Sequence, residues 1–276
     1  MADLRDRLVI CSVEECLGPC KKWLGSDRVA AQLYQMLGGR LVLETSGHPA
    51  GVRDLHRQLD LDTPVLCWEG DWLYSFVSEN ICSEPALPQK EMKALARDLL
   101  EAFPTASLSV LAPSGAIYLP RVNRLAHAYL KNEESPYLLS ELDSIPLPWY
   151  RVTLFAEPAL FTRIRMYLSE KEFQGYRFFQ KEMRLQFLPQ AIGKEQALKQ
   201  LWGQLGVLPQ NTLWLGCKET PPQVLRLIGI PVAAWGAGGE VRALAQGRLP
   251  RHHEGCLGET LYRLCKGENG DEDRGV

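Results

Sequence analysis

Residues 8–15 read LVICSVEE, four apolar residues followed by a serine, a valine and two glutamates. A short apolar run bounded by polar residues is typical of a strand buried on both faces of a sheet. The segments that follow it alternate between helical spacing and short apolar runs, at 27–37, 41–43, 50–59 and 64–68. Helices and strands in alternation at this spacing predict right-handed crossovers and a parallel sheet.

The segment from 80 to 189 does not keep this alternation. Strand candidates stand among helical patterns, the strands at 107–112, 117–119, 151–155 and 183–188 and the helices at 90–103, 122–130 and 159–168. Strands mixed with helices in this way predict an α+β cap that packs as a separate unit. From 190 the first pattern returns, with predicted helices at 194–205, 222–228 and 257–265 and predicted strands at 212–216 and 230–234.

These patterns together predict an α/β core interrupted by a cap. The predicted core comprises 1–79 and 190–265, and the predicted cap comprises 80–189. The polar, glycine-containing tail at 266–276 is expected to be disordered. The chain contains no internal repeat and no low-complexity tract.

The charges of the chain are nearly balanced, with 31 basic and 33 acidic residues and a net charge of −2. This balance argues against a protein that holds DNA or RNA mainly through phosphate contacts. No stretch approaches the ~20 apolar residues of a membrane span, and the first apolar run is shorter than the core of a signal peptide. We therefore expect a cytoplasmic protein whose eight scattered cysteines are reduced thiols rather than a disulfide scaffold.

The residues that follow the predicted core strands are the candidates for chemistry, because ligands of an open parallel sheet bind at the carboxyl ends of its strands. They are Ser12 to Glu15, Thr45 to Gly47, Cys67 to Gly70, Cys217 to Pro221, and Trp235 with Gly236. Most of these side chains are polar or small, so this edge of the sheet is the place to look for a site.

In these and neighbouring segments the chain resembles the haloacid dehalogenase (HAD) superfamily, in the branch with a cap inserted after the third strand. The likeness is to mannosyl-phosphoglycerate, sucrose-phosphate and Cof-type sugar phosphatases. The segments that carry it are 41–47, 65–74, 191–198, 205–216 with 229–233, and 255–264. The resemblance implies a HAD-like Rossmannoid core with a parallel sheet, an inserted α+β cap, and magnesium-dependent hydrolysis of phosphate esters.

The departures from this family fall on the residues of the chemistry. The resemblance implies an aspartate nucleophile and an acid–base aspartate where this chain has Ser12 and Glu14, and metal-binding acidic residues where it has Cys217 and Pro221. A serine hydroxyl is a poor magnesium ligand and a weak nucleophile without a base. A neutral cysteine and a proline do not replace two carboxylates, although Glu219 offers another carboxylate nearby. We therefore expect no cofactor, with Mg²⁺ required only if the chain is an active phosphatase.

The non-covalent part of such a site is still present in Thr45, Ser46 and Lys194. Two hydroxyls and an ammonium beside helix N-termini make an anion site without a metal, so these residues are predicted to bind phosphate. The alternative for Lys194 is an ion pair with Glu14 or Glu219, and the alternative for the hydroxyls is to satisfy backbone groups of the turn. Likewise Ser12 and Glu14 form either an altered catalytic pair or a solvated loop.

Other polar and aromatic residues are weaker candidates. The spacing of Cys11, Cys16 and Cys20 is not that of a strong metal site, so buried thiols are the expectation for these cysteines and for Cys67 and Cys217. We place His48 at the rim of the predicted site and His252 with His253 in a polar loop. Packing accounts for the aromatic residues, which are Trp68, Trp72 and Tyr74, and for 176–179 the alternatives are the inner face of the cap and its core.

Three functions of different class follow from these observations. The first is a pseudophosphatase that binds a phosphorylated sugar or a partner protein as a regulatory subunit. The second is a working sugar-phosphate phosphatase, a phosphoric monoester hydrolase with an altered nucleophile. The third is a structural protein whose cap surface binds other proteins. Because three positions of the chemistry are changed together, the first is the hypothesis we carry forward.

Overall fold

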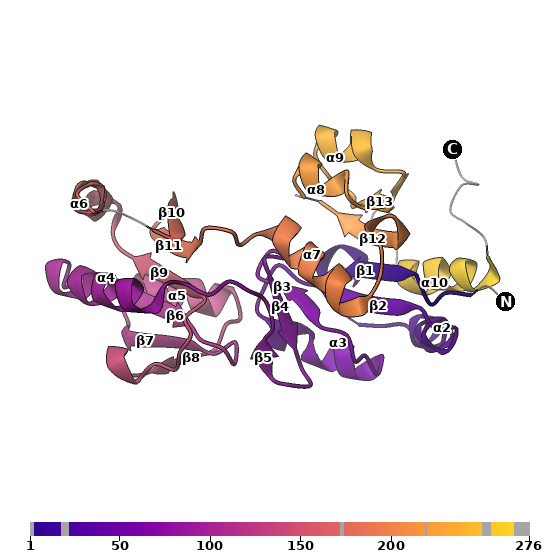
Figure 1. The fold of residues 1–276 in the computed structure, drawn as a ribbon, viewed down its shortest axis with the longest axis horizontal. Coiled ribbons are helices and arrows are strands. Elements are labelled where there is room, and N and C mark those ends of the chain that lie inside the picture. The colour runs from indigo at the N-terminus through magenta and orange to yellow at the C-terminus, as the bar shows by residue number, and fades with distance from the viewer. Residues whose placement is uncertain (1–2, 18–21, 172–173, 219, 250–254, 268–276) are drawn as a thin grey trace. The chain divides into compact units, whose positions relative to one another are not determined.

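The computed structural model describes residues 3–17, 22–171, 174–218, 220–249 and 255–267. The chain divides into two compact units, the core unit at 1–77 with 194–276 and the insert unit at 78–193. Each unit has its own sheet and its own helices (Figure 1). The sequence patterns place the two boundaries at 79/80 and 189/190, within a few residues of these divisions.

The core unit is built on a mainly parallel sheet with the strand order β14-β13-β12-β1-β2-β3-β4. β1 (Leu8–Ser12) lies between β12 (Thr212–Cys217) and β2 (Arg40–Glu44) and runs parallel to both. All five residues of β1 are buried, as expected of a strand covered on both faces. The other strands are β13 (Ile230–Ala233), β14 (Gly247–Arg248), β3 (Val65–Cys67) and β4 (Trp72–Ser75), which is antiparallel to β3. The predicted α/β fold with a parallel sheet is confirmed.

Helices connect these strands in the order that the periodicity predicts. α7 (Lys194–Leu205) has the predicted bounds, and α10 (Cys256–Lys266) is one residue longer at each end than predicted. α2 and α10 pack closely, and the N–H of Gly258 donates to the carboxylate of Asp27 at 2.8 Å. The remaining helices are α1 (Val13–Leu17), α2 (Gly25–Met36), η2 (Pro49–Val52), α3 (Arg53–Gln58), η4 (Pro209–Asn211), α8 (Pro222–Leu225) and α9 (Gly239–Leu244).

Some local predictions for the core unit differ from the structure, among them the helix predicted at 222–228, which ends at Leu225. The residues after β1 form α1 instead of a solvated loop, and Ser12 itself is buried. Apolar Val13 and Cys16 anchor this short helix to the sheet, since both are buried. The helix predicted at 50–59 is a 3-10 turn followed by α3, because Pro49 opens a tight turn that His48 caps. The difference after β1 places Ser12 inside the fold and leaves Glu14 and Glu15 partly exposed on α1.

The insert unit has the mixed α+β composition that its sequence predicts. Its sheet has the strand order β10-β11-β9-β6-β7-β8. β9 (Arg151–Phe155) has the predicted bounds, and the other strands are β6 (Ser107–Leu111), β7 (Ile117–Arg121), β8 (Tyr137–Leu139), β10 (Tyr176–Lys181) and β11 (Arg184–Pro189). The unit also contains β5 (Asn80–Ile81), α4 (Gln89–Ala102), α5 (Arg124–Asn132), η3 (Leu142–Ser144) and α6 (Pro158–Ser169).

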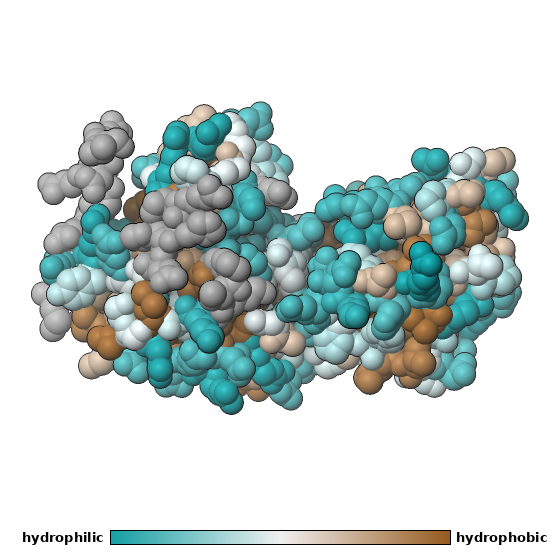
Figure 2. Space-filling model, turned by 180° about the vertical axis from the view of Figure 1, so that it is seen from behind, coloured by the Kyte–Doolittle hydropathy of each residue, from teal (hydrophilic) through white to brown (hydrophobic). Residues whose placement is uncertain are grey.

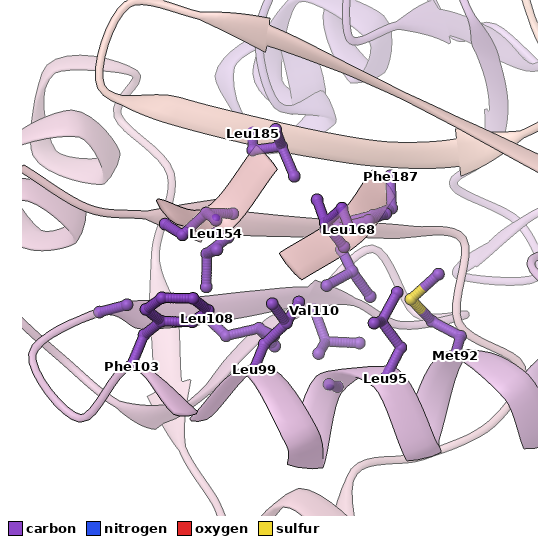
Figure 3. Close-up of a cluster of buried hydrophobic side chains, with 14 of the residues drawn as sticks. Met92, Leu95, Leu99, Phe103, Leu108, Val110, Leu154, Leu168, Leu185 and Phe187 are labelled. Carbon is purple, nitrogen blue, oxygen red and sulfur yellow. The ribbon is translucent and has the colours of Figure 1, made fainter. Parts of the chain in front are cut away.

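The hydrophobic core of the insert unit lies between its sheet and two helices. Met92, Leu95 and Leu99 of α4 face Leu154 and Phe187 of the sheet, and all five are buried (Figure 3). Buried residues of α6 belong to the same cluster, so α4 and α6 cover one face of the sheet. The ring of Tyr129 on α5 lies 5.4 Å from that of Phe155. Adjacent strand residues point to opposite faces, so α5 covers the other face.

Two further expectations concern the chain as a whole. The described part of the chain contains no helix that combines the length and the apolar character of a membrane span. The predicted disordered tail lies outside the described residues from 268 onward, while Lys266 is still part of α10.

Candidate functional site

The candidate site lies where β1, β2 and β12 end side by side. Ser12 ends β1 and is the register partner of Glu44, which ends β2. Cys217 ends β12 on the other side of β1. Lys194 at the start of α7 reaches the same edge, because its ammonium lies 3.8 Å from a carboxylate oxygen of Glu44. The structure therefore brings together residues that are far apart in the sequence.

Ser12 is held inside the fold rather than presented at its surface. Ser12 is only 3% exposed. The indole N–H of Trp214, on the neighbouring strand β12, donates to Ser12 Oγ at 2.9 Å. This bond satisfies a buried indole N–H that would otherwise lose its water partner. Ser12 thus has a structural role as the acceptor for Trp214.

Glu14 and Thr45 are partners of each other. The Thr45 hydroxyl donates to Glu14 Oε1 at 2.5 Å, and it also accepts the backbone N–H of Gly47 at 3.2 Å. The second bond is the turn-stabilising role that the sequence leaves open for this hydroxyl. The carbonyl of Ser46 accepts the N–H of Glu69 at 3.0 Å, and Ser46 is exposed. Phosphate binding by Thr45 and Ser46 stays a prediction.

Lys194 has two partners within the core unit. Besides Glu44 at 3.8 Å, its ammonium lies 5.2 Å from the centre of the Trp214 ring, in a cation–π contact. A backbone turn at Gly70 (φ +79°) passes so close that a Cβ there would lie 2.8 Å from Lys194 Cε. The sequence allowed an ion pair of Lys194 with Glu14 or Glu219, whereas the ion pair in the structure is with Glu44 and Glu219 lies outside the described residues.

Glu44 is the most deeply buried carboxylate of the site. Burial raises the pKa of Glu44 above its ordinary value, and the neighbouring carboxylates of Glu14 and Glu15 raise it further. The Lys194 ammonium and the Ser12 hydroxyl act in the opposite direction and lower this pKa. The Glu44 carboxylate therefore needs Lys194 and Ser12 in order to stay ionised, and it in turn holds both side chains in place.

The positions where the resemblance implies metal-binding carboxylates do not offer metal ligands of that kind. Burial raises the pKa of the Cys217 thiol to about 12, and the thiol donates to the carbonyl of Trp214 at 3.6 Å. Pro221 precedes α8 as its N-cap residue and has no side-chain donor. Thr220 is buried. Within the described ranges, no group of three or more His, Cys, Asp or Glu side chains is arranged to hold a metal ion.

A second ion pair lies at the outer side of this edge. Lys218, which follows β12, places its ammonium 3.1 Å from Glu15 Oε1 on α1. The Glu15 side chain is 21% exposed and that of Lys218 is 47% exposed, so this pair is partly solvated. Together with Lys194–Glu44 and Thr45–Glu14, it means that each of the three carboxylates of the site contacts a donor of the same unit.

The buried cysteines form a thiol cluster rather than a ligand set. The Cys16 thiol lies 3.8 Å from the carbonyl of Leu215, and the Cys256 thiol lies 3.6 Å from the carbonyl of Cys16. A hydrogen bond that the Cys16 thiol donates to Cys11, together with burial, raises the pKa of Cys16 well above its ordinary value. Protonated, buried thiols are chemically inert. This agrees with the prediction of buried thiols, while Cys20 lies outside the described residues.

His48 and the aromatic residues near it have packing roles. His48 Nδ1 accepts the N–H of Ala50 at 3.1 Å as the cap of η2, and its ring lies edge-on to Trp68 at 5.5 Å. Trp68, Trp72 and Tyr74 are buried, as the packing interpretation predicts. His252 and His253 lie outside the described residues.

Sequence reasoning missed three residues that shape this site, namely Glu44, Glu15 and Trp214. Glu44 had a usable signal, because an acidic residue at the end of the buried run 41–43 needs a partner. Glu15 was seen only as part of a strand end, and Trp214 looked like one more buried residue of an apolar strand. Their partners are distant in the sequence, so only the fold reveals the contacts.

The chain is similar to known proteins both in sequence pattern and in structure. A family model described as haloacid dehalogenase-like hydrolase matches residues 25–261. A solved haloacid dehalogenase-like hydrolase from Bacteroides thetaiotaomicron has a TM-score of 0.74 to this chain at 18% identity, over 94% of this chain and 99% of its own. One from B. subtilis has a TM-score of 0.62 at 17% identity, over 94% and 99%.

A solved HAD subclass IIB sugar phosphatase has a TM-score of 0.63 at 13% identity, over 94% of this chain and 98% of its own. At these identities the likeness to solved structures shows a shared fold. None of the curated proteins matches the chain.

Proposed function

Since the chain belongs to the family of haloacid dehalogenase-like hydrolases, we propose that it keeps the fold of this family without the hydrolysis and acts as a pseudophosphatase. In this proposal it is a non-catalytic binding or regulatory protein of the cytoplasm. The observation that carries the proposal is the internal pairing of the site: Ser12 with Trp214, Thr45 with Glu14, and Lys194 with Glu44. The match to the family model begins at residue 25, after Ser12 and Glu14.

The arrangement around Ser12 speaks against a serine nucleophile. A serine attacks phosphorus or carbon only when a base takes its proton, and that base must lie within hydrogen-bond reach. Ser12 Oγ accepts from the indole of Trp214, which is a donor and never a base, and the Ser12 hydroxyl also bonds to the carboxylate of Glu44. That carboxylate is the ion-pair partner of Lys194, so in this proposal it is a structural partner of Ser12 rather than its base. Glu14 contacts the hydroxyl of Thr45 instead, and we infer that Ser12 and Glu14 do not form a catalytic pair.

Magnesium chemistry does not fit the residues either. Mg²⁺ takes oxygen ligands and holds them in a near-octahedral arrangement. At the positions that the resemblance assigns to the metal, this chain has a buried, protonated thiol at Cys217 and a proline at 221. The proposal therefore includes the expectation that the protein needs no metal ion.

The same pairing sets a limit on the predicted anion site. A phosphate that approached Lys194 would meet the carboxylate of Glu44 beside the ammonium, with Glu14 and Glu15 close enough to raise the pKa of Glu44. Like charges at such distances oppose binding. Binding of a phosphorylated ligand at Thr45, Ser46 and Lys194 thus requires Glu44 to be displaced or protonated, and we expect it to be weak and stronger at low pH.

Phosphate release from a panel of sugar phosphates, with and without Mg²⁺, tests the proposal. We expect no release above background from the purified chain, while an active subclass IIB sugar phosphatase run in parallel gives a clear signal. Release that depends on Mg²⁺ and falls in Glu14→Gln would overturn the proposal and establish a phosphatase with an altered nucleophile.

A thermal-shift measurement with the same sugar phosphates tests the binding part. Stabilisation by a ligand that binds only the folded state grows with ligand concentration. A shift that is present in the natural chain and absent in Lys194→Ala supports the anion site. Glu195→Ala is the matched control, because Glu195 is the next residue of α7 and pairs with Lys199 instead of the site.

A further inference from the structure

We propose that the insert unit joins copies of this chain end to end, by pairing β8 of one copy with β10 of the next. This inference goes beyond the pseudophosphatase proposal and does not depend on it. Of the strands that the structure describes, β8 and β10 are the two outermost of the insert sheet. An outermost strand directs half of its backbone N–H and C=O groups away from the sheet, where another strand can pair with them.

Both outer strands carry exposed apolar side chains. Leu138 and Leu139 of β8 are 55% and 66% exposed, and Phe179 of β10 is 41% exposed. Because adjacent strand residues point to opposite faces, the exposure of both leucines means that neither face of β8 is covered. Figure 2 shows hydrophobic residues at the lower margin of this unit, on the side where β7 and β8 lie in Figure 1. Exposed apolar side chains on an outer strand indicate a contact surface.

The charges of the two outer strands are complementary. β10 contains the exposed basic residues Arg177 and Lys181 and no acidic residue, and exposed Glu182 follows it. β8 is uncharged, but exposed Glu133 and Glu134 precede it and exposed Glu141 follows it. Complementary charge favours contact between unlike edges and disfavours contact between two copies of the same edge. The partner that fits β8 is therefore β10 of a second copy of this chain.

The register of the sheet leads to one alignment of the two copies. A single row of register partners crosses the whole sheet on the face that α4 and α6 cover, and it consists of Phe178, Phe187, Val152, Val110, Tyr118 and Leu138. The row begins on β10 and ends on β8. Placing Phe178 of the next copy beside Leu138 continues the row without a change of face, and the strands are then parallel.

This alignment places complementary side chains beside each other on the opposite face. Tyr137 lies beside Arg177 of the next copy, which suits a cation–π contact. The Arg177 guanidinium also donates to the carbonyl of Ile192 of its own chain at 3.0 Å. Leu139 lies beside Phe179, and Glu141 lies beside Lys181. Apolar, cation–aromatic and ionic pairs thus all arise from a register that was fixed by the row of partners alone.

The direction of the backbone groups is compatible with this register. The N–H of Ser140 donates to Leu119 at 3.1 Å, so Ser140 faces β7 and Leu139, its neighbour, faces outward. The N–H of Gln190 donates to the carbonyl of Gly175 at 3.0 Å, so Gly175 faces β11 and Gln180, five residues later, faces outward. In a parallel pair a residue bonds to the neighbours of its register partner. Leu139 opposite Phe179 of the next copy therefore meets the N–H of Gln180.

The contact uses two different surfaces of the chain, so it is a heterologous contact. Such a contact does not close on itself in a dimer, because each added copy leaves one β8 and one β10 free to pair. We expect the protein to form chains of increasing length as its concentration rises.

Two proline variants test the contact, one for each outer strand. Leu139→Pro and Gln180→Pro each remove an outward N–H and add a ring that hinders a neighbouring strand, while the bonds within the sheet remain. Analytical ultracentrifugation over about a hundredfold range of concentration follows the assembly, which we expect to grow beyond dimers in the natural chain. Each variant alone should be a monomer. An equal mixture of the two should form a one-to-one dimer and no larger species, because one intact β8 and one intact β10 remain.

The dimer formed by the mixture also shows that both variants are folded. A natural chain that stays monomeric over the whole range overturns the proposal. A single variant that still dimerises also overturns it, since that result means that like edges pair. The double variant Leu139→Pro/Gln180→Pro is the negative control and should join neither partner.

Charge reversal at the surface gives a second test that does not threaten folding. Glu141→Lys should weaken the assembly about tenfold, and mixing it with Lys181→Glu should restore part of the loss. The effect should shrink at high salt. Equal weakening by Glu240→Lys, which changes an exposed acidic residue of α9 in the core unit, would contradict the alignment.

Discussion

Polar side chains at the end of the core sheet are paired within the fold, whereas charged side chains beside the outer strands of the insert sheet are exposed. At the core sheet, Lys194 and Glu44 contact each other, and Ser12 accepts a bond from buried Trp214. At the insert sheet, Lys181 and Glu141 are exposed beside apolar side chains. Polar groups at the end of the core sheet are thus paired with one another, whereas charged side chains beside the outer strands of the insert sheet lie at the surface. This difference supports the proposal that the chain acts through binding at a surface.

The largest effect that separates packing from surface is expected within the insert unit itself. Phe187→Ala removes a fully buried ring of the core cluster and should lower the free energy of unfolding by about 4 kcal/mol. Phe179→Ala removes an exposed ring and should change it by less than ~0.5 kcal/mol. Urea unfolding of both variants measures the difference. Similar losses for the two would mean that Phe179 is part of the folded core and not of a free surface.

The next largest effect tests whether the site of the core unit is internally paired. Lys194→Met leaves the buried Glu44 carboxylate without its cation and should cost about 3 kcal/mol. In a Glu44→Gln background the same change should cost about 1 kcal/mol, since no buried charge remains unpaired. Chemical denaturation of the four proteins gives the coupling. Equal costs in both backgrounds would show that Lys194 is free to serve a ligand.

A smaller effect is expected at Ser12. Ser12→Ala removes the acceptor of the buried Trp214 N–H and should cost about 1–2 kcal/mol. In a Trp214→Phe background the same change should cost less, because no indole donor is left unsatisfied and only the bond of the Ser12 hydroxyl to Glu44 is lost. Urea midpoints of the variants measure this difference. An equal cost in both backgrounds would mean that the bond from Trp214 contributes nothing.

The smallest expected effect is a pH dependence from Glu44. Burial raises the pKa of Glu44 in the folded chain, so folding favours its protonated form. This contribution is complete below the ordinary carboxyl pKa of about 4.3 and is lost as pH rises through the higher folded pKa. Glu44→Gln has no such loss, so its stability relative to the natural chain should increase from about pH 4 to about pH 7. Urea midpoints across this range check the sign, and a decrease would mean that Lys194 dominates over burial.

Much of the fold could be predicted from the sequence because its signals are local. The apolar run at 8–11 predicts β1, and the helical spacing at 194–205 predicts α7. The pattern at 151–155 predicts β9 with its correct bounds. The outer strand β8 was missed, because it is only three residues long and its leucines are not buried. For the residues of β10, the sequence allowed either the inner face of the cap or its core. The strand contains both buried Tyr176 and exposed Phe179, so its side chains do not share one environment.

Less of the site could be predicted, because its contacts join residues that are distant in the sequence. The positions of Ser12, Thr45 and Lys194 at one edge follow from strand ends and a family resemblance. Their partners do not, since Trp214 is 202 residues from Ser12. The ion pair of Lys194 with Glu44 depends on how the first turn of α7 approaches β2, which no local pattern encodes.

The register pairing of Ser12 with Glu44 has a consequence for how such a chain can change over evolutionary time. An aspartate at position 12 would place a new carboxylate directly across from Glu44, with Glu14 and Glu15 close by, and like charges in this buried place repel strongly. An aspartate at position 12 is therefore harmful unless Glu44 is replaced first. The order in which these two positions can change is thus constrained by their place beside each other at the end of the sheet.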